Sequence, residues 1–136
     1  MYSKFIGLFF LIAAFMAVSS LAGFLEYTPM KYSQSKLVYD LAERAIKHYN
    51  KQKHRKPYDR VDLCVVKTAL HKQKRVDLYR VYMATFKPKC LKIADNDCYP
   101  TLMAEIVKTS AKKYKVSYVQ PVKLFNIGYT DCHFPQ

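Results

Sequence analysis

One segment of the chain, "SKLVYDLAERAIKHYNKQ", places apolar residues at steps of three and four. This spacing gives a helix one apolar face and predicts a single amphipathic helix. Ser35 is of a residue type that caps helix N-termini, and Lys47 and Lys51 stand toward the end that favours cations. The residues expected on the apolar face are Leu37, Val38, Leu41, Ala42, Ala45, Ile46 and Tyr49.

Four runs rich in valine, leucine, tyrosine and phenylalanine follow, and we interpret them as strands. Leu102–Val107 also fits a short helix, and Pro121 favours an edge position or a bulge. The segment "GFLEYTPMKYS" can add a short strand before the helix. The pattern predicts an α+β fold, with one N-terminal helix packed on a four- to five-stranded antiparallel sheet. The four runs are Val61–Leu70, Val76–Phe86, Thr101–Thr109 and Val116–Phe125.

Two turns of the predicted meander are basic. The segment "HKQKR" joins the first two strands, and "AKKYK" joins the last two. In a meander these two turns lie at the same end of the sheet, so we expect them to be neighbours. We call residues 71–75 and 111–115 the basic tips. Their predicted partner-binding residues are Lys72, Gln73, Lys74, Arg75, Lys112, Lys113, Tyr114 and Lys115, with Tyr114 as an exposed aromatic.

The start of the chain has the features of an export signal. Lys4 precedes the apolar stretch "FIGLFFLIAAFMAV", and the small residues "SSLAG" follow. A membrane span needs roughly 20 apolar residues, which this stretch does not reach. Ser20 and Ala22 are small at the positions that signal peptidase inspects, which predicts cleavage before Gly23. We expect a signal peptide over 1–22 and one secreted domain over 23–136 with no stable membrane span.

All four cysteines lie after this signal, at Cys64, Cys90, Cys98 and Cys132. An even number in an exported chain favours two disulfides over free thiols. Three pairings are open. We favour Cys90 with Cys98, because a bridge would close the loop-like "LKIADND", leaving Cys64 to pair with Cys132. Zinc is disfavoured, because the chain lacks a close Cys-x-x-Cys pair.

The charge narrows the choice of partners. The chain carries a formal net charge of +13, and Lys4 is the only charged residue before Gly23, so the secreted domain carries +12. A field of this sign attracts sulfated glycans, nucleic acid, anionic lipid or acidic proteins, and it also keeps a secreted protein soluble.

The chain shows no catalytic signature. Gly-x-Ser-x-Gly, His-Glu-x-x-His and a glycine-rich phosphate loop are all absent from the sequence, which holds three glycines. We therefore predict a non-enzymatic monomer without cofactor or metal. The four histidines, His48, His54, His71 and His133, stand beside charged, helix-end or terminal residues, and we expect them to be solvated.

The order of elements resembles the cystatin family of secreted cysteine-protease inhibitors. The resemblance rests on "AIKHYNK" at the helix end, on the hairpin "VDLCVVKTAL…VDLYRVYMATF", on Gly23 upstream of the helix and on four cysteines late in the chain. It spans most of the domain after the signal. The resemblance implies inhibition of papain-like proteases by a wedge made of an N-terminal glycine segment and two hairpins.

The wedge motifs of cystatins are only partly present. Gly23 matches the N-terminal glycine, although the predicted cleavage leaves nothing before it. The first cystatin hairpin has Gln-x-Val-x-Gly, of which this chain keeps Gln73 but has Arg75 and Asp77 in place of valine and glycine. The second has Pro-Trp, and this chain contains no tryptophan. Lysine and arginine tips must stay hydrated or find carboxylates, which disfavours tight burial in a cleft.

Two hypotheses of function follow from these observations. The first is a cystatin-like inhibitor of a papain-like cysteine protease whose cleft has an acidic rim. The second is a basic secreted interaction protein whose hairpin tips bind an anionic surface, such as a glycosaminoglycan, an acidic protein or a lipid.

Overall fold

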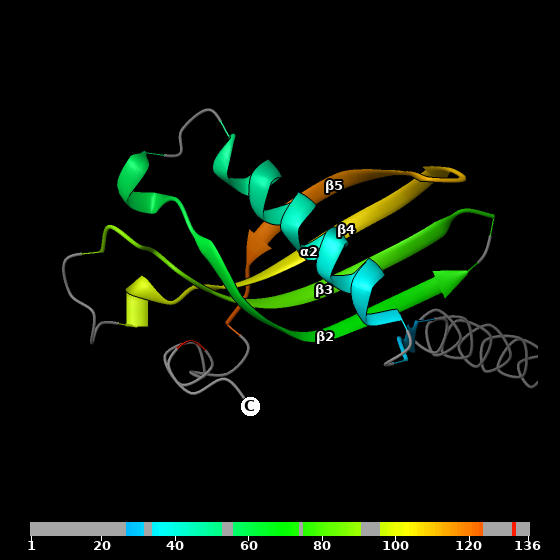
Figure 1. The fold of residues 1–136 in the computed structure, drawn as a ribbon, viewed down its shortest axis with the longest axis horizontal. Helices are drawn as coiled ribbons and strands as arrows, with labels where there is room; N and C mark the ends of the chain where they lie inside the picture. The colour runs from blue at the N-terminus through cyan, green and yellow to red at the C-terminus, as the bar shows by residue number, and fades with distance from the viewer. Residues whose placement is uncertain are drawn as a thin grey trace, which may run out of the picture.

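The computed structural model describes residues 27–31, 34–52, 56–73, 75–90, 96–123 and 132. One helix packs on one face of a five-stranded antiparallel sheet with the strand order β1-β2-β3-β4-β5, which confirms the predicted α+β fold (Figure 1). The predicted signal segment 1–22 lies outside the described residues. The elements are β1 (Thr28–Pro29), α2 (Ser35–Asn50), η2 (Pro57–Asp59), β2 (Asp62–Gln73), β3 (Asp77–Phe86), η3 (Asn96–Cys98), β4 (Thr101–Ser110) and β5 (Lys113–Pro121).

Helix α2 buries the predicted apolar face. Its buried residues are Leu41, Ala42, Ala45, Ile46 and Tyr49, while Leu37 packs against the same cluster from the side. The expected cap was wrong: Ser35 is the first helical residue, and the N-cap position is Gln34, whose side chain makes no capping hydrogen bond. The helix is therefore stabilised by packing of its apolar face and not by its N-terminus.

The core lies between α2 and the facing side of the sheet. α2 contacts all four long strands, because it crosses the sheet diagonally (Figure 1). The sheet contributes residues from alternate positions of each strand, as expected for a sheet with one covered face. These buried strand residues are Tyr79, Val81, Met83, Leu102, Ala104, Ile106 and Val119.

Two hydrogen bonds of the Asn50 side chain join the end of α2 to the start of the sheet. Asn50 Nδ2 donates to the carbonyl of Val61 at 2.9 Å, and Val61 N–H donates to Asn50 Oδ1 at 3.0 Å. Val61 is 1% exposed, so its peptide groups have little access to water. Asn50 therefore satisfies two backbone groups that burial would otherwise leave without partners.

We expect Asn50→Ala to lower the free energy of unfolding by about 2–3 kcal/mol, because two buried polar groups lose their partner. Urea denaturation at equilibrium measures this change. Lys51→Ala, at the neighbouring exposed residue, is the matched control and should change stability by less than about 0.5 kcal/mol. If Asn50→Ala lowered the free energy of unfolding no more than the control does, the Asn50 hydrogen bonds would not stabilise the fold as proposed.

The strands differ from their predicted bounds mainly at the second hairpin. The last strand starts at Lys113 and not at Val116, because a two-residue turn leaves no room for a longer loop. It ends at Pro121 and not at Phe125, and residue 125 lies outside the described part. The helical alternative for Leu102–Val107 is wrong, since these residues pair on both sides within β4. β5 is an edge strand that ends in Pro121, as expected from the proline.

The two favoured disulfides are both present. Cys64 bonds Cys132 across a sequence separation of 68, and Cys90 bonds Cys98 across a separation of 8. Cys64 stands at a bulge of β2, between the register pairs of Leu63 and Val65. The long-range bridge therefore fastens residue 132 to β2.

Candidate functional site

Both basic tips lie at one end of the sheet, as the meander requires. The β2–β3 and β4–β5 turns are seen side by side at the right of Figure 1, whereas the β3–β4 connection lies at the opposite end. Adjacent strands are about 4.8 Å apart, so the centres of the two turns are about 10 Å apart across the sheet. We call this end of the sheet the hairpin end.

The register makes each tip a separate projection. Pairing between β3 and β4 stops at Leu78 and Val107. Beyond this row the first hairpin continues to the pair Gln73 and Asp77, and the second continues to Ser110 and Lys113. The two tips therefore extend past the common sheet with side chains accessible from several directions.

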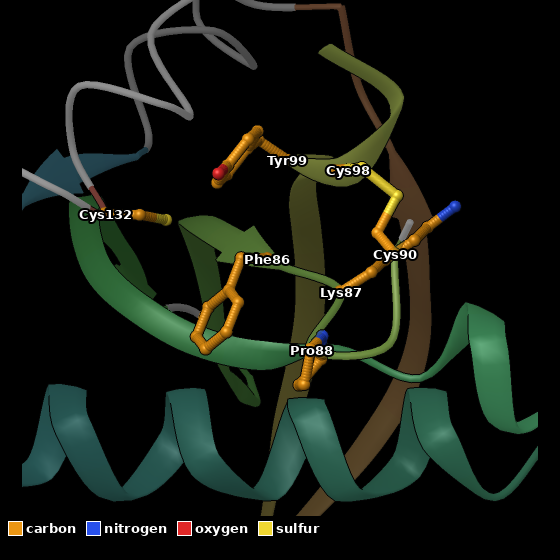
Figure 2. Close-up of a pocket in the computed structure, with 7 residues that line it drawn as sticks. All are labelled: Phe86, Lys87, Pro88, Cys90, Cys98, Tyr99 and Cys132. Carbon is orange, nitrogen blue, oxygen red and sulfur yellow. A yellow bond between two sulfur atoms is a disulfide. The ribbon is translucent and has the colours of Figure 1, made fainter. Parts of the chain in front are cut away.

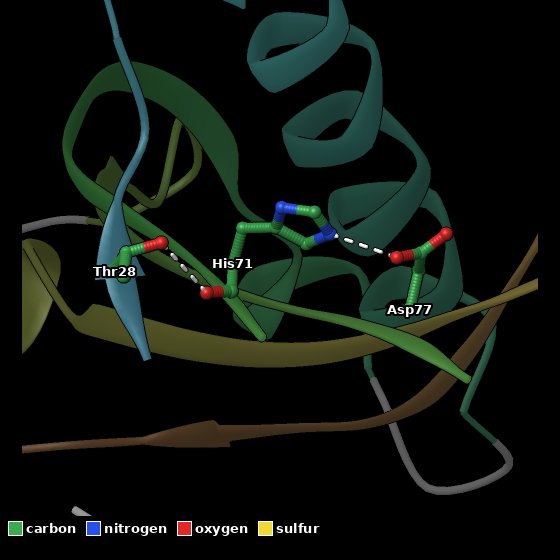
Figure 3. A network of polar contacts seen from close by, with 3 residues as sticks. All are labelled: Thr28, His71 and Asp77. Carbon is green, nitrogen blue, oxygen red and sulfur yellow. Dashed lines mark hydrogen bonds and ion pairs between the residues drawn. The ribbon is translucent and has the colours of Figure 1, made fainter. Parts of the chain in front are cut away.

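A contact between His71 and Asp77 lies at the base of the first tip (Figure 3). His71 Nε2 lies 3.1 Å from Asp77 Oδ1, and the imidazole stacks on Tyr79 with a centroid distance of 4.5 Å and an interplanar angle of 8°. Thr28 Oγ1 donates to the His71 carbonyl at 3.2 Å and joins β1 to the same point. The expectation of a solvated imidazole was wrong for His71, because the register brings an acid and an aromatic ring to it.

Lys72 is part of β2 and does not stand on the turn. It is half-buried, and its Nζ lies 5.4 Å from the centroid of the Tyr27 ring. The same ring lies 4.4 Å from the Arg80 guanidinium carbon. Two cations therefore share one aromatic ring on the sheet face away from α2, an arrangement favoured by the negative potential of the ring face. The sequence predicted Lys72 on the turn, whereas its ammonium group lies over the Tyr27 ring on this face of the sheet.

Tyr114 is not the exposed aromatic that the sequence suggested. Its side chain is half-buried against the core, meets Tyr79 edge to face at 5.9 Å, and lies 6.0 Å below the Arg44 guanidinium. The reason is the alternation of β5: Tyr114 and Val116 face α2, while Lys113 and Lys115 are exposed. The second tip therefore exposes its three lysines to solvent, while Tyr114 packs against the core.

The charges of the hairpin end are strongly unbalanced. The ten residues of the two basic tips hold six lysines or arginines and no acid. Asp77 follows the first tip, and its carboxylate is already engaged by His71. Arg75, Lys112, Lys113 and Lys115 are exposed. Gly23 and Lys74 of the predicted site lie outside the described residues.

A second polar cluster, which the sequence did not reveal, lies on the sheet face away from α2. Arg80 Nε is 3.4 Å from Glu105 Oε2, and Tyr118 Oη donates to the same oxygen at 2.9 Å. The three residues share one row of the sheet register. Only the register could have identified them, because they are far apart in the sequence.

The hydrogen bond to Glu105, followed by burial and the charge of Glu105, raises the pKa of Tyr118 above the ordinary value of 10.0. A raised folded-state pKa stabilises the fold below the unfolded-state pKa, and this contribution is lost as pH rises through the folded-state pKa. We expect Tyr118→Phe to show a shallower loss of unfolding free energy than wild type above about pH 10. Denaturation at a series of alkaline pH values measures the two slopes, and equal slopes for Tyr118→Phe and wild type would contradict this linkage.

A pocket lies at the end of the sheet opposite the basic tips (Figure 2). Its volume is about 250 Å³, and both disulfides contribute to its wall. Lys87 is its cationic residue, and the Lys87 Nζ lies 3.7 Å from Asp59 Oδ1. The lining residues are Phe86, Lys87, Pro88, Cys90, Cys98, Tyr99 and Cys132.

Within the described residues, no helix combines the length and the hydropathy that a membrane crossing requires. The same part of the chain contains no cluster of three or more histidine, cysteine, aspartate or glutamate side chains arranged to hold a metal ion. No protein-family model, curated protein or solved structure matches this chain.

Proposed function

We propose that this chain is a secreted, cystatin-like interaction protein that binds a sulfated glycosaminoglycan through its two basic tips. The observation that carries the proposal is the placement of both tips at one end of the sheet, with exposed cations on each. Asp77, the acid nearest to them in sequence, contributes one negative charge, against six lysines and arginines in the two tips. Anionic groups therefore meet a local excess of positive charge at this end.

The shape of the hairpin end favours a linear polyanion. Two projections about 10 Å apart form a narrow edge, along which a chain with repeated sulfates can contact both tips at once. Contact at two tips raises the effective concentration for the second, so weak single contacts add to a useful affinity. The side chains at the tips remain hydrated in such a complex, which avoids the cost of burying lysine heads.

A lipid surface fits the tips less well. Stable attachment to a membrane combines basic residues with apolar side chains that enter the interface. Val76 follows the first tip and is 47% exposed. The described part of the two tips adds no other exposed large apolar side chain. Tyr114, the other candidate, is engaged with the core. We therefore place an anionic lipid second to a glycan.

Protease inhibition is the second candidate function. The observation that favours it is the same pair of projecting hairpins, which form a wedge like the one implied by the resemblance to cystatins. The tips would enter a cleft only if its rim supplied carboxylates for Arg75 and the lysines, because unpaired cations resist desolvation. The predicted target is therefore a papain-like protease with an acidic rim.

One set of measurements separates these functions. The oxidised protein is applied to immobilised heparin at low salt and eluted with a salt gradient, and is titrated in parallel against a panel of papain-like proteases. Glycan binding predicts retention that is lost as salt shortens the Debye length toward about 3 Å at 1 M. Failure to bind heparin at low salt overturns the first proposal. Inhibition of a protease without heparin retention establishes the second in its place.

A further inference from the structure

The turn between β2 and β3 exposes a peptide bond outside any strand. β2 ends at Gln73 and β3 begins at Asp77, and both Arg75 and Val76 between them are exposed. Val76 is 47% exposed although it is apolar. Exposed turns of this kind are preferred sites of proteolytic cleavage.

The residues before this bond form a recognisable pair in the sequence. Lysine followed by arginine occurs once in the chain, at positions 74 and 75. A different basic pair, Arg55 and Lys56, precedes Pro57, which blocks cleavage after the pair by most endoproteases because the scissile nitrogen belongs to the proline ring. Arg75 is thus favoured as a cleavage position both by the basic pair that it completes and by its exposure.

The other tip carries two adjacent lysines but is better protected. Lys113 already belongs to β5, and its carbonyl accepts a hydrogen bond from Thr109 Oγ1 at 3.2 Å. The next residue, Tyr114, packs against the core and Tyr79. Cleavage after Lys113 would require this tyrosine to leave its contacts, whereas Arg75 and Val76 belong to no strand.

Local opening of the first tip breaks one peripheral strand pair and the His71–Asp77 contact, but no pairing with a third strand. A protease binds its substrate as an extended chain, so several residues around the bond must leave the hairpin. The outermost pair, Gln73 and Asp77, has no third strand beside it, since β4 pairs with β3 only from Leu78 inward. Such peripheral pairs open at a small fraction of the global unfolding free energy, and cleavage then follows the population of the open form.

We propose that the Arg75–Val76 bond is a processing site for an endoprotease that cleaves after paired basic residues. Water adds across the peptide bond: its hydroxyl joins the carbonyl carbon of Arg75, and its hydrogen joins the nitrogen of Val76. The products are a new carboxylate on Arg75 and a new amino group on Val76. This proposal does not depend on glycan binding.

The disulfides determine what happens to the two fragments. Cys64 lies before the cleaved bond and Cys132 after it, so their bridge holds the fragments together. Cys90 and Cys98 both lie in the second fragment. Cleavage therefore yields a two-chain molecule in which residues 72–75 become a free end. This end is no longer held opposite the lysines of the second tip, so processing would change the spacing of the charges at the hairpin end.

The test uses the oxidised protein and a subtilisin-like endoprotease specific for Lys-Arg. We expect a single species without reductant, heavier by one water molecule, and two fragments after reduction. The amino terminus of the second fragment should read Val-Asp-Leu. Electrophoresis with and without reductant, followed by mass spectrometry and terminal sequencing, provides the measurement.

Two variants control for the site of cleavage. Arg75→Gln should be cleaved at least about tenfold more slowly, because the specificity pocket of the protease loses its charge partner. Lys113→Gln removes the adjacent lysines of the other tip and should be cleaved at the wild-type rate. Equal thermal midpoints would show that both variants keep the fold. The proposal is overturned if the protein stays intact, if the first cut is elsewhere, or if the fragments separate without reductant.

Discussion

Replacing Cys64 and Cys132 together by serine is expected to lower the free energy of unfolding by about 4 kcal/mol. A bridge across 68 residues removes a large amount of chain entropy from the unfolded state, and the loop-closure relation gives about 4.4 kcal/mol at this length. Because a typical domain is stable by only about 5–15 kcal/mol, this loss is a large part of the total. Guanidinium denaturation without reductant measures it.

The second disulfide supplies the matched control. Cys90 and Cys98 are separated by only 8 positions, for which the same relation gives about 2.5 kcal/mol. The paired serine variant at these positions should therefore be the more stable of the two by about 2 kcal/mol. Equal stability of the two variants, or the reverse order, would show that strain or residual structure decides the effect instead of loop length.

The helix and the strand order were predictable because they depend on local patterns. The apolar steps from Leu41 to Tyr49 required a helix with one covered face, and all five positions predicted within this stretch are buried. The four strand runs were separated by turn residues, and short turns in sequence make neighbouring strands antiparallel. The meander assumed from this strand order placed the two basic tips at one end of the sheet.

The positions of side chains at the second tip could not be predicted in the same way. The sequence "KKYKV" alternates, but alternation alone does not say whether Tyr114 or the lysines face the core. The answer depends on the two-residue turn, which starts β5 at Lys113 and turns Tyr114 toward α2. A longer turn would have left the tyrosine on the tip, as the sequence suggested.

The polar contacts that support the hairpin end depend on register in the same way. His71 and Asp77 are six residues apart, and they meet because the first hairpin turns back between Gln73 and Asp77. Glu105 joins Arg80 and Tyr118 from two neighbouring strands. Such contacts are fixed by which residues pair across strands, and composition or hydropathy does not reveal this. The sequence therefore predicted the positive charge of the tips, but it did not predict the polar contacts beside them.

Neutralising the tips is expected to weaken heparin binding by at least about 100-fold at low salt. Each lysine or arginine close to an anionic surface contributes about 1 kcal/mol, and five removed charges leave room for a large loss even with imperfect additivity. The variant replaces each cation by glutamine, which keeps length and polarity. The replaced residues are Lys74, Arg75, Lys112, Lys113 and Lys115.

The matched control removes the same number of charges at the other end of the sheet. These residues are exposed and lie after α2, between α2 and β2, after β3, or beyond β5. The control should lose far less affinity than the tip variant if the tips form the binding site. Equal losses would mean that net charge alone drives retention, which contradicts a defined site. The control residues are Lys51, Lys56, Arg60, Lys89 and Lys123.

The tip variant also distinguishes glycan binding from protease inhibition. Heparin retention depends on the charges, so glutamine should abolish it while the fold is kept. A wedge that fills a cleft by shape would keep its inhibition, because the hairpins retain their backbone and glutamine is less costly to desolvate than lysine. A wedge held by an acidic rim would lose inhibition together with its charges, chiefly through slower association that added salt would mimic. The salt dependence of the wild-type association rate therefore decides whether an inhibitory hairpin end works by shape or by charge.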